Sequence, residues 1–403
     1  MKKIAILVFF TVGFFVHVWA CTGLIAGKQA TVDGSVLVTY SADSHTLYGA
    51  LTSSPAADWP KGSMRSIVEW DTNKPLGEIE QVEHTYAVMG NMNEHQLTVV
   101  ESTWGGRPEL VDTTGIIDYG SLMQLALERA KTAREAIKVM TGLVKKYGYY
   151  SSGESFTIAD PNEAWILDLI GKGPGRRGAV WVAVRIPDDC IAGHANYPRI
   201  HKIPMDDKEN CLYSPDVISF AREMGYFDGL NKDFSFARAY SPADFGALRA
   251  CDARVWSFFR KYDSSMDNYL PYVNGESAEP FPLYVKPSRK LSVQDMKEAM
   301  RDHFEDTPFD MTQDVGAGPF KVPYRFRPMS FEVDGKSYCM ERAIATQQTG
   351  FTLVGQMRNW LPDPVGGVLW FGTDDANMTV FTPVYCCTDK VPVCYSRVDG
   401  ADY

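Results

Sequence analysis

The chain opens with a pattern of charged and apolar residues that is typical of a secretory signal. Lys2 and Lys3 precede an apolar run from Ile4 to Val16, and the small residue Ala20 ends the segment. A basic start, a short apolar stretch and a small-residue cleavage site together predict removal of residues 1–20. Cleavage there makes Cys21 the first residue of the mature protein and predicts a periplasmic or extracellular location.

Short apolar runs bounded by turn residues predict strands in the first half of the chain. The expected strands are Thr22–Ala26, Val36–Tyr40, Ala164–Ile170 and Ala179–Ile186. An Asp-Gly pair between the first two predicts a hairpin, which places Cys21 at the edge of a sheet. The segment GKGPGRRG between the last two is interpreted as a solvated hairpin loop. A phosphate-binding glycine loop opens a helix, and here strand-like sequence follows instead.

Helical periodicity dominates the middle of the chain. Apolar residues recur at helical spacing over residues 118–146, which predicts one helix in an outer layer. Residues 242–262 predict a second helix with Phe245 on its apolar face. Ser292 and Asp295 have the spacing of a capping box and predict the start of a third helix.

Strand-like sequence returns toward the C-terminus, with a tight turn at 333–336 and expected strands at 351–357 and 368–371. Strands therefore fall at both ends of the chain and helices lie between them. This order favours one α+β domain over residues 21–403 rather than two independent domains.

Composition limits the partners of this protein. The formal net charge is −10, and removal of Lys2 and Lys3 makes it more negative. Nucleic acid is not an expected partner, because phosphate binding requires a basic surface. No stretch after Cys21 reaches the ~18 consecutive apolar residues of a membrane span, so a soluble mature protein is expected. A homo-oligomer is left open.

A cysteine at the mature N-terminus combines two catalytic groups. Its thiol is a strong nucleophile, and its free α-amine, with an ordinary pKa of roughly 7.7–8.0, can act as a general base near neutral pH. The remaining cysteines do not have the spacing of a small disulfide scaffold, although Cys386, Cys387 and Cys394 are close enough in sequence for one bridge.

Five segments resemble one family of enzymes. They are CTGLIAGKQATVDGSVLVTYSADSHTLYG from Cys21 onward, GNMNEHQLTVVEST near 90–103, YYSSGESFTIADPNEAWIL near 149–167, GHANYPRI at 193–200 and GGVLWFGTDDAN at 366–377. In this order they resemble the dipeptidase A family of cysteine N-terminal-nucleophile (Ntn) hydrolases, distant relatives of penicillin V acylase and the bile salt hydrolases. The resemblance implies an αββα four-layer sandwich. It also implies hydrolysis of dipeptides through a thioester on Cys21, without a cofactor or metal.

The resemblance also implies roles for four further residues. Asp43 matches an aspartate that holds the amine or thiol in register, and Asn196 matches an oxyanion donor. Thr103 falls in register with a second donor. Arg254 matches an arginine near the nucleophile that would lower the thiol pKa, with Arg249 as its competitor. The family's arginine just before the aspartate is absent, since residues 39–42 read TYSA.

Three alternatives stay open. An amidase of the penicillin V acylase or bile salt hydrolase type would differ only in substrate. A peptide-binding lipoprotein anchored at Cys21 is disfavoured, because Val18 and Trp19 do not match a lipidation signal. A conventional Cys-His site would draw on His45, His84 or His95. The family's chains usually extend further, so a C-terminal truncation is also considered.

Overall fold

The computed structural model describes residues 21–44, 49–325 and 330–397, and two large sheets form its centre. The seven-stranded sheet has the order β16 (Tyr284–Val285), β14 (Ile191–His194), β1 (Gly23–Ala26), β2 (Val36–Asp43), β19 (Thr349–Met357), β20 (Val368–Thr373) and β21 (Thr382–Tyr385). The eight-stranded sheet has the order β15 (Cys211–Tyr213), β13 (Ala179–Ile186), β12 (Ala164–Gly171), β11 (Gly153–Ala159), β10 (Thr98–Trp104), β9 (Met92–Asn93), β8 (Val88–Met89) and β3 (Ser53–Ser54).

Helices and small hairpins surround these sheets. The helices are α1 (Tyr119–Arg129), α2 (Ala133–Tyr147), α3 (Val217–Glu223), α4 (Phe236–Tyr240), α5 (Ala253–Arg260), α6 (Leu270–Val273), α7 (Val293–Met300), α8 (Asp363–Gly366) and α9 (Val393–Ser396). The strand pairs outside the large sheets are β4 (Ala57–Asp58) with β7 (His84–Thr85), β5 (Met64–Val68) with β6 (Pro75–Glu80), and β17 (Ser330–Val333) with β18 (Lys336–Cys339). The predicted α+β class is confirmed.

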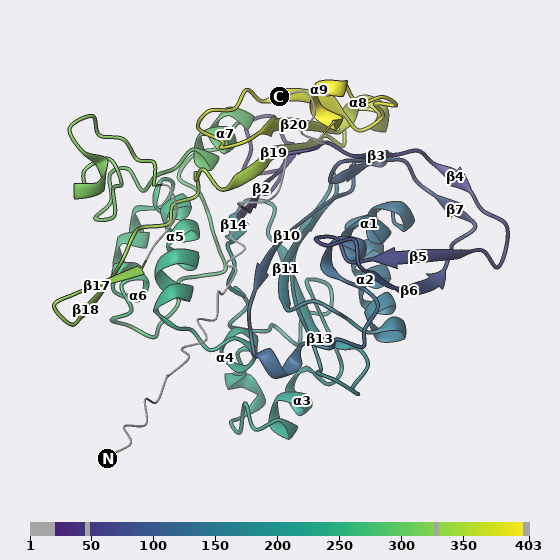
Figure 1. Ribbon diagram of the computed structural model, residues 1–403, viewed down its shortest axis with the longest axis horizontal. Coiled ribbons are helices and arrows are strands. Elements are labelled where there is room, and N and C mark those ends of the chain that lie inside the picture. The colour runs from purple at the N-terminus through teal and green to yellow at the C-terminus, as the bar shows by residue number, and fades with distance from the viewer. Residues whose placement is uncertain (1–20, 45–48, 326–329, 398–403) are drawn as a thin grey trace, which may run out of the picture.

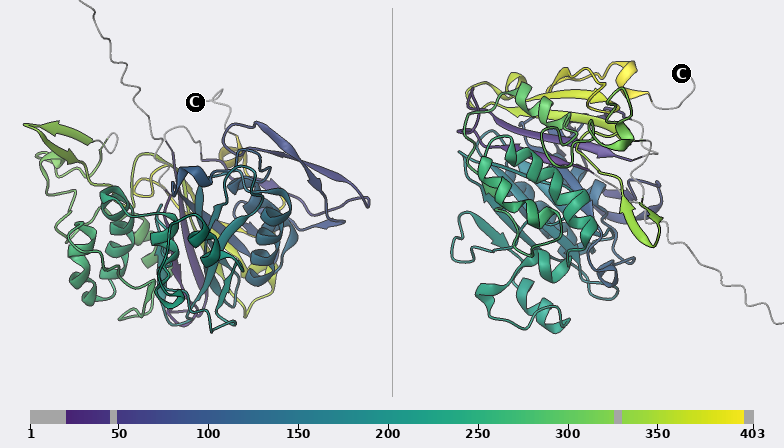
Figure 2. Two further views of the ribbon diagram at one scale, coloured as in Figure 1. Left: turned by 90° about the horizontal axis from the view of Figure 1, so that it is seen from below. Right: turned by 90° about the vertical axis from the view of Figure 1, so that its left-hand side faces the viewer.

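The two large sheets face each other, and helices cover their outer faces (Figure 1; Figure 2). Side chains between the sheets include Ile25, Val38, Val100, Ile166 and Leu353. A second apolar cluster joins the eight-stranded sheet to α1 and α2, and includes Val99, Leu125, Met140 and Phe156. A third joins the seven-stranded sheet to α5 and α7, and includes Leu37, Phe258, Met296 and Val354. Alternate strand residues enter different clusters because successive side chains point to opposite faces.

The predicted strands that flank the thiol are present. β1 and β2 form an antiparallel pair in which Ile25 lies opposite Val38, and β2 then pairs with β19 from the far end of the chain. The strands predicted at 164–170 and 179–186 are β12 and β13, which pair along their whole length around the predicted loop. Because β2 is buried along all eight residues, its C-terminal end delivers Tyr40 and Asp43 to the interior.

The prediction of a single helix over 118–146 is wrong, since two helices occupy this segment. Asp118 caps α1 by accepting from the Ser121 amide, and Thr132 caps α2 by accepting from the Glu135 amide. An N-cap side chain satisfies amide groups that have no partner in the first helical turn, so Thr132 starts a new helix without a proline or glycine break. Apolar periodicity continues across both helices and conceals the boundary.

The predicted helix over 242–262 is a composite of a π-helical segment, Ala247–Asp252, and α5. Phe245 is exposed, so its placement on the buried face is wrong. A π-helical turn shifts the register of the side chains that follow, and such turns are frequent at functional sites. The capping box of Ser292 and Asp295 is confirmed at the start of α7. None of the helices in the described ranges combines the length and apolar character that a bilayer span requires.

Gly23 provides a test of packing around the first strand. A Cβ atom at this position would lie 2.9 Å from both Cε1 and Nε2 of His194, whose ring is fixed by Ser102 and Thr157. We expect Gly23→Ala to lower the free energy of unfolding by about 1–3 kcal/mol, because the ring has to shift within a packed interior. Denaturant unfolding of purified protein measures this change.

The matched control is Gly142→Ala in α2, where nothing lies within 4 Å of the added Cβ. This substitution should raise stability by roughly 0.5–1 kcal/mol, since alanine favours a helix interior over glycine. Equal effects of the two substitutions would contradict the steric argument for Gly23.

Candidate active site

Cys21 lies two residues before the start of β1 and is buried, with 4% of its surface exposed. Its Sγ atom is 3.8 Å from the hydroxyl oxygen of Tyr40, which in turn donates to Glu101 Oε1 at 2.5 Å. Burial raises the pKa of the Cys21 thiol well above its ordinary value, and the negative charges of Glu101 and Asp43 raise it further. The thiol is therefore protonated at neutral pH, and a nucleophilic thiolate would form there only with the help of a base.

Arg254 on α5 is the residue that connects the start of β1 to the rest of the site. Its guanidinium donates to the Cys21 carbonyl at 2.8 Å, to Thr22 Oγ1 at 2.7 Å and to Asn196 Oδ1 at 2.8 Å. The sequence placed Arg254 near the nucleophile, and the structure brings it to the backbone of Cys21. Arg254 binds the carbonyl oxygen of Cys21 rather than its thiol, so this contact supports a role in positioning Cys21.

Asn196 follows β14 in a left-handed backbone conformation, with φ of 59°, which asparagine tolerates better than most residues. Its amide nitrogen donates to the Thr103 carbonyl at 2.5 Å, and its backbone N–H donates to Ser102 Oγ at 3.1 Å. Ser102 is also 2.6 Å from His194 Nδ1. Burial lowers the pKa of His194 to about 3, with Arg254 as the next cause, so this imidazole is neutral and serves the hydrogen-bond network.

Thr103, on β10, enters the site in two ways. Its carbonyl binds Asn196, and its hydroxyl donates to Glu154 Oε1 at 2.7 Å. Thr103 and Glu154 are direct partners in the antiparallel pairing of β10 with β11. The structure thus brings Thr103 next to Asn196, and the sequence analysis expects both to be oxyanion donors. The hydroxyl of Thr103, however, donates to the carboxyl group of Glu154.

Asp43 ends β2 and is bound by side chains from a distant part of the chain. Its carboxylate accepts from the Arg342 guanidinium and, at 2.6 Å, from Thr349 Oγ1. Arg342 precedes β19 and is buried, 299 positions away from Asp43 in sequence. It supplies a cation beside Asp43, although the sequence lacks the expected arginine at 39–42. A sequence signal for this pairing is absent, because only the neighbouring strands β2 and β19 bring the residues together.

The competing residues lie elsewhere. Arg249 forms an ion pair with Glu341 at 2.7 Å and also donates to Asn274. His84 pairs with Asp58 at 2.7 Å, and His95 pairs with Asp363 at 3.5 Å. His45 lies outside the described residues. The thiol of Cys21 contacts the hydroxyl of Tyr40 rather than a histidine, so the contacts of the described histidines do not support a Cys-His site.

Glu101 and Glu154 are site residues that the sequence analysis did not single out. Both are buried, and Thr103 Oγ1 lies 3.5 Å from Glu101 Oε2 and 2.7 Å from Glu154 Oε1. Burial raises the pKa of each carboxyl group, and the charge of Glu101 raises the pKa of Glu154 further. The signal was present in the motifs TVVEST and GESFT, where polar residues interrupt strand-like sequence.

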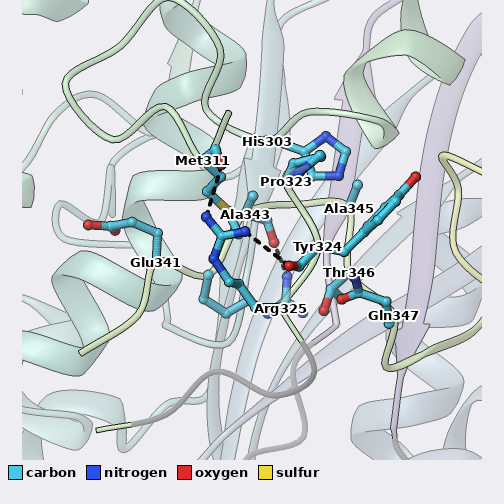
Figure 3. Close-up of a pocket in the computed structure, with 11 residues that line it drawn as sticks. His303, Met311, Pro323, Tyr324, Arg325, Glu341, Ala343, Ala345, Thr346 and Gln347 are labelled. Carbon is cyan, nitrogen blue, oxygen red and sulfur yellow. Dashed lines mark hydrogen bonds between the residues drawn. The ribbon is translucent and has the colours of Figure 1, made fainter. Parts of the chain in front are cut away.

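A small cavity lies behind the Asp43 side of the site and is lined by Arg342, Ala343 and Arg325, among others (Figure 3). Its volume of about 10 Å³ leaves room for little more than one water molecule. A dipeptide does not fit there. Among the residues that the structure describes, no group of three His, Cys, Asp or Glu side chains is placed to hold a metal ion.

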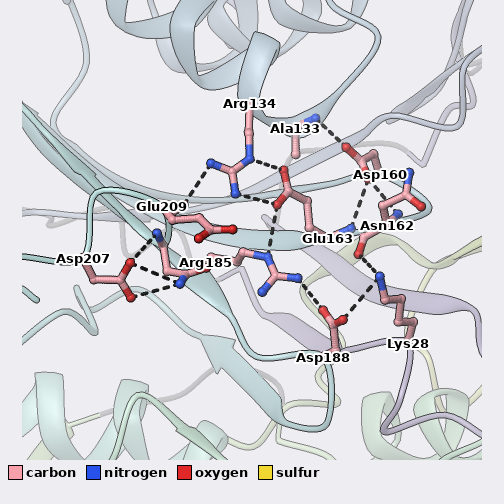
Figure 4. A network of polar contacts seen from close by, with 11 residues as sticks. Lys28, Ala133, Arg134, Asp160, Asn162, Glu163, Arg185, Asp188, Asp207 and Glu209 are labelled. Atoms are coloured by element: carbon pink, nitrogen blue, oxygen red, sulfur yellow. Dashed lines mark hydrogen bonds and ion pairs between the residues drawn. The ribbon is translucent and has the colours of Figure 1, made fainter.

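A separate ion network occupies the opposite end of β1 (Figure 4). Lys28, just after β1, pairs with Asp188 at 3.3 Å, and Asp188 pairs with Arg185 at 2.6 Å. Glu163 then joins Arg185 to Arg134 on α2. This network links both sheets to α2 by partly exposed pairs, which contribute little stability individually.

The buried thiol, the positioned amide of Asn196 and the surrounding carboxyl groups are components that acyl transfer to a cysteine requires. The site thus has the chemistry of a cysteine hydrolase. The chain belongs to peptidase family C69, whose family model matches residues 20–403. This match confirms the resemblance recognised from the motifs and the prediction of a peptide-hydrolysing enzyme.

Proteins named as dipeptidases or probable dipeptidases align with this chain over most of their own length. The chain is 26% identical to "Probable dipeptidase" of Salmonella dublin over 393 residues, which cover 91% of this chain and 81% of the relative. It is 25% identical to "Probable dipeptidase" of Latilactobacillus sakei, covering 88% and 71% of the two chains. It is 24% identical to "Dipeptidase A" of Lactobacillus helveticus, covering 92% and 76%.

The carboxyl pair leads to a prediction about stability. A carboxyl group whose pKa is higher in the folded state than in the unfolded state gives stability that is present at low pH and lost as pH rises through its folded-state pKa. Since Glu154 is such a group, we expect Glu154→Gln to gain stability relative to wild type as pH rises from 5 to 8. Denaturant unfolding of both proteins across this range measures the difference.

The control is Glu209→Gln, at an exposed side chain near the network of Figure 4. Its stability should follow that of wild type at each pH. A stability difference between Glu154→Gln and wild type that does not change with pH would show that Glu154 does not hold a proton in the folded protein.

Proposed function

We propose that this protein is an exported cysteine-type dipeptidase in which Cys21 is the nucleophile and the first residue of the mature chain. The observation that carries the proposal is the position of Cys21, whose carbonyl is held by Arg254 while the same guanidinium holds Asn196. The names of the relatives support a dipeptide as substrate. The signal-like pattern of residues 1–20 supports export, although this segment lies outside the described residues.

The proposed reaction has two halves. The free α-amine of Cys21 takes the thiol proton, and Sγ attacks the carbonyl carbon of the scissile peptide bond. The resulting tetrahedral intermediate collapses when the amine returns the proton to the leaving nitrogen, which releases the C-terminal amino acid and leaves a thioester. Water then attacks the thioester, gives a proton to the amine, and the N-terminal amino acid leaves as Sγ regains its proton.

Each neighbouring residue has a role in this scheme. The amide nitrogen of Asn196 carries two N–H donors, of which one goes to the Thr103 carbonyl. The second is the proposed donor to the oxyanion. Asp43 fixes the end of β2 beside the thiol, and Arg342 balances its charge. Arg254 keeps the Cys21 backbone and Asn196 in fixed relation.

The layer order supports the αββα Ntn-hydrolase sandwich as the finer description of the fold. Helices α1 and α2 cover one sheet, and α5 and α7 cover the other. The nucleophile lies at the start of a strand that faces the second sheet, where the amine freed by processing would be adjacent to the thiol. In this scheme the catalytic base, the α-amine of Cys21, exists only after the segment before Cys21 has been removed.

Maturation provides the first test of this mechanism. We expect the exported protein to begin at Cys21, to hydrolyse unblocked dipeptides without added metal, and to lose activity on alkylation by iodoacetamide but not on chelation. A variant that retains one additional residue before Cys21 should fold yet be almost inactive, because its amine has become a non-basic amide. N-terminal sequencing, intact mass and dipeptide turnover measure these outcomes.

Cys21→Ala is the matched control for the thiol. It should be inactive both in the processed protein and in the variant that retains one additional residue. Full activity of the extended variant, with its mass confirming the extra residue, would contradict the amine as base. Turnover of acylated amino acids in place of unblocked dipeptides would instead support the amidase reading.

Asn196 provides the second test. Asn196→Ala should lower kcat by roughly 10²–10³-fold with a nearly unchanged KM, because an oxyanion donor acts mainly in the transition state. Asn210→Ala, at a half-buried turn residue bound to Asp207, serves as the control and should keep wild-type kinetics. If Asn196→Ala instead lowered kcat/KM by the same factor through a higher KM, with kcat unchanged, Asn196 would be a substrate-binding residue.

A further inference from the structure

Glu101 and Glu154 form a buried acidic pair beside the thiol. Tyr40 connects Glu101 to Cys21, since its hydroxyl oxygen is 2.5 Å from Glu101 Oε1 and 3.8 Å from Sγ. Thr103 connects the two glutamates through its single hydroxyl. The Tyr40 hydroxyl is therefore the one group between Glu101 and the sulfur atom of Cys21 in this chain of contacts.

If these two carboxyl groups ionise, no cation lies beside them within the described part of the chain to balance their charge. No ion pair with lysine, arginine or histidine is formed there by either glutamate, whereas the buried Asp43 and Asp252 each have an arginine partner. Moreover, Glu154 Oε2 is buried without a hydrogen-bond partner. Burying a carboxyl oxygen without a partner is costly, and such atoms in native structures call for an explanation.

A second tyrosine, Tyr119, is influenced by the charge of Glu101 and contacts an exposed acid. Tyr119 at the start of α1 donates to Asp71 at 2.8 Å, and Asp71 is exposed in the turn between β5 and β6. Burial and the charges of Glu101 and Asp71 raise the pKa of Tyr119, which places the tyrosine within electrostatic reach of both acids.

We propose that Glu101 and Glu154 bind the α-ammonium group of the substrate's N-terminal residue. This inference rests on the proposed dipeptidase function and names the group that the site recognises. In a dipeptide the α-ammonium nitrogen is only two bonds from the scissile carbonyl carbon. When Sγ attacks that carbon, the ammonium falls within reach of the acidic pair, and its three N–H donors can satisfy Glu154 Oε2.

This assignment would restrict hydrolysis to the first peptide bond of an unblocked peptide. A peptide bond further along a chain would place an amide in the acidic pair, and an amide carries no charge to balance the carboxylates. A substrate with a blocked N-terminus would leave the glutamates unpaired in the same way. The penalty for unpaired buried groups makes such selection strong.

The experiment compares two ligands that differ only at this group. The first is an unblocked dipeptide, and the second is its des-amino analogue, with hydrogen in place of the ammonium. Wild type, Glu101→Gln, Glu154→Gln and the surface control Glu209→Gln are each assayed for kcat/KM on both. Binding of both ligands to the same variants in a Cys21→Ala background is measured by calorimetry, so that turnover does not interfere.

We expect each glutamine variant to lose at least about 30-fold in kcat/KM and in affinity for the dipeptide, because one partner of a buried charge pair is removed. For the des-amino analogue the change should stay below about threefold. Glu154→Asp, which keeps the charge, should recover part of the loss, and Glu209→Gln should match wild type on both ligands.

Two results would overturn the assignment. An equal loss on both ligands, with unchanged unfolding temperature, would show that the pair acts on the amine or thiol of Cys21 rather than on the substrate. Unchanged kinetics would show that it has no role in recognition. By contrast, a wild-type enzyme that is alkylated at Cys21 but hydrolyses no unblocked dipeptide would refute the proposed function itself.

Discussion

The guanidinium of Arg254 is the interaction on which the geometry of the site depends. It is fully buried and binds the Cys21 carbonyl, the Thr22 hydroxyl, the Ala195 carbonyl and the Asn196 side chain. Three separate elements thus meet at one planar, rigid group: the start of β1, the turn after β14 and helix α5. A lysine would place a single point charge there and could not hold these acceptors in fixed directions.

Burial of this cation has a cost that the rest of the site offsets. Desolvation, with the repulsion of Arg342 as the next cause, lowers the pKa of Arg254 to about 10, so the group stays charged at neutral pH. Its acceptors are carbonyl and hydroxyl oxygens rather than a carboxylate. Hydrogen bonds replace the lost hydration without neutralising the charge. Removal of the guanidinium would therefore leave several buried acceptors unpaired at once.

The sequence predicted the elements around the thiol better than the contacts between them. Hairpin and strand signals identified β1, β2, β12 and β13, because turn chemistry and apolar runs are local properties. The boundary between α1 and α2 was missed, since Thr132 starts a helix by a side-chain cap that periodicity does not reveal. Family motifs brought Cys21, Asn196, Thr103 and Arg254 to attention, and these residues are close together in the structure.

Charge balance was the part that the sequence could not supply. The family's arginine before Asp43 is absent from the sequence, but Arg342 reaches the carboxylate of Asp43 from the loop before β19. Glu101 and Glu154 interrupt strand-like sequence as polar residues, but the sequence does not show that they form a buried pair in which Glu154 Oε2 has no hydrogen-bond partner. Both features depend on which strands are neighbours, and a single chain of letters does not contain that information.

The electrostatics of the site connect recognition to reactivity. Glu101 is one of the charges that keep the proton on the Cys21 thiol, while Arg254 is bound to backbone and amide oxygens and Arg342 to Asp43. A thiolate is thus unfavourable among these charges. If a substrate ammonium pairs with Glu101 and Glu154, the same event weakens the repulsion that opposes deprotonation of the thiol. The nucleophile would then become reactive only when a peptide with a free amino terminus is in place.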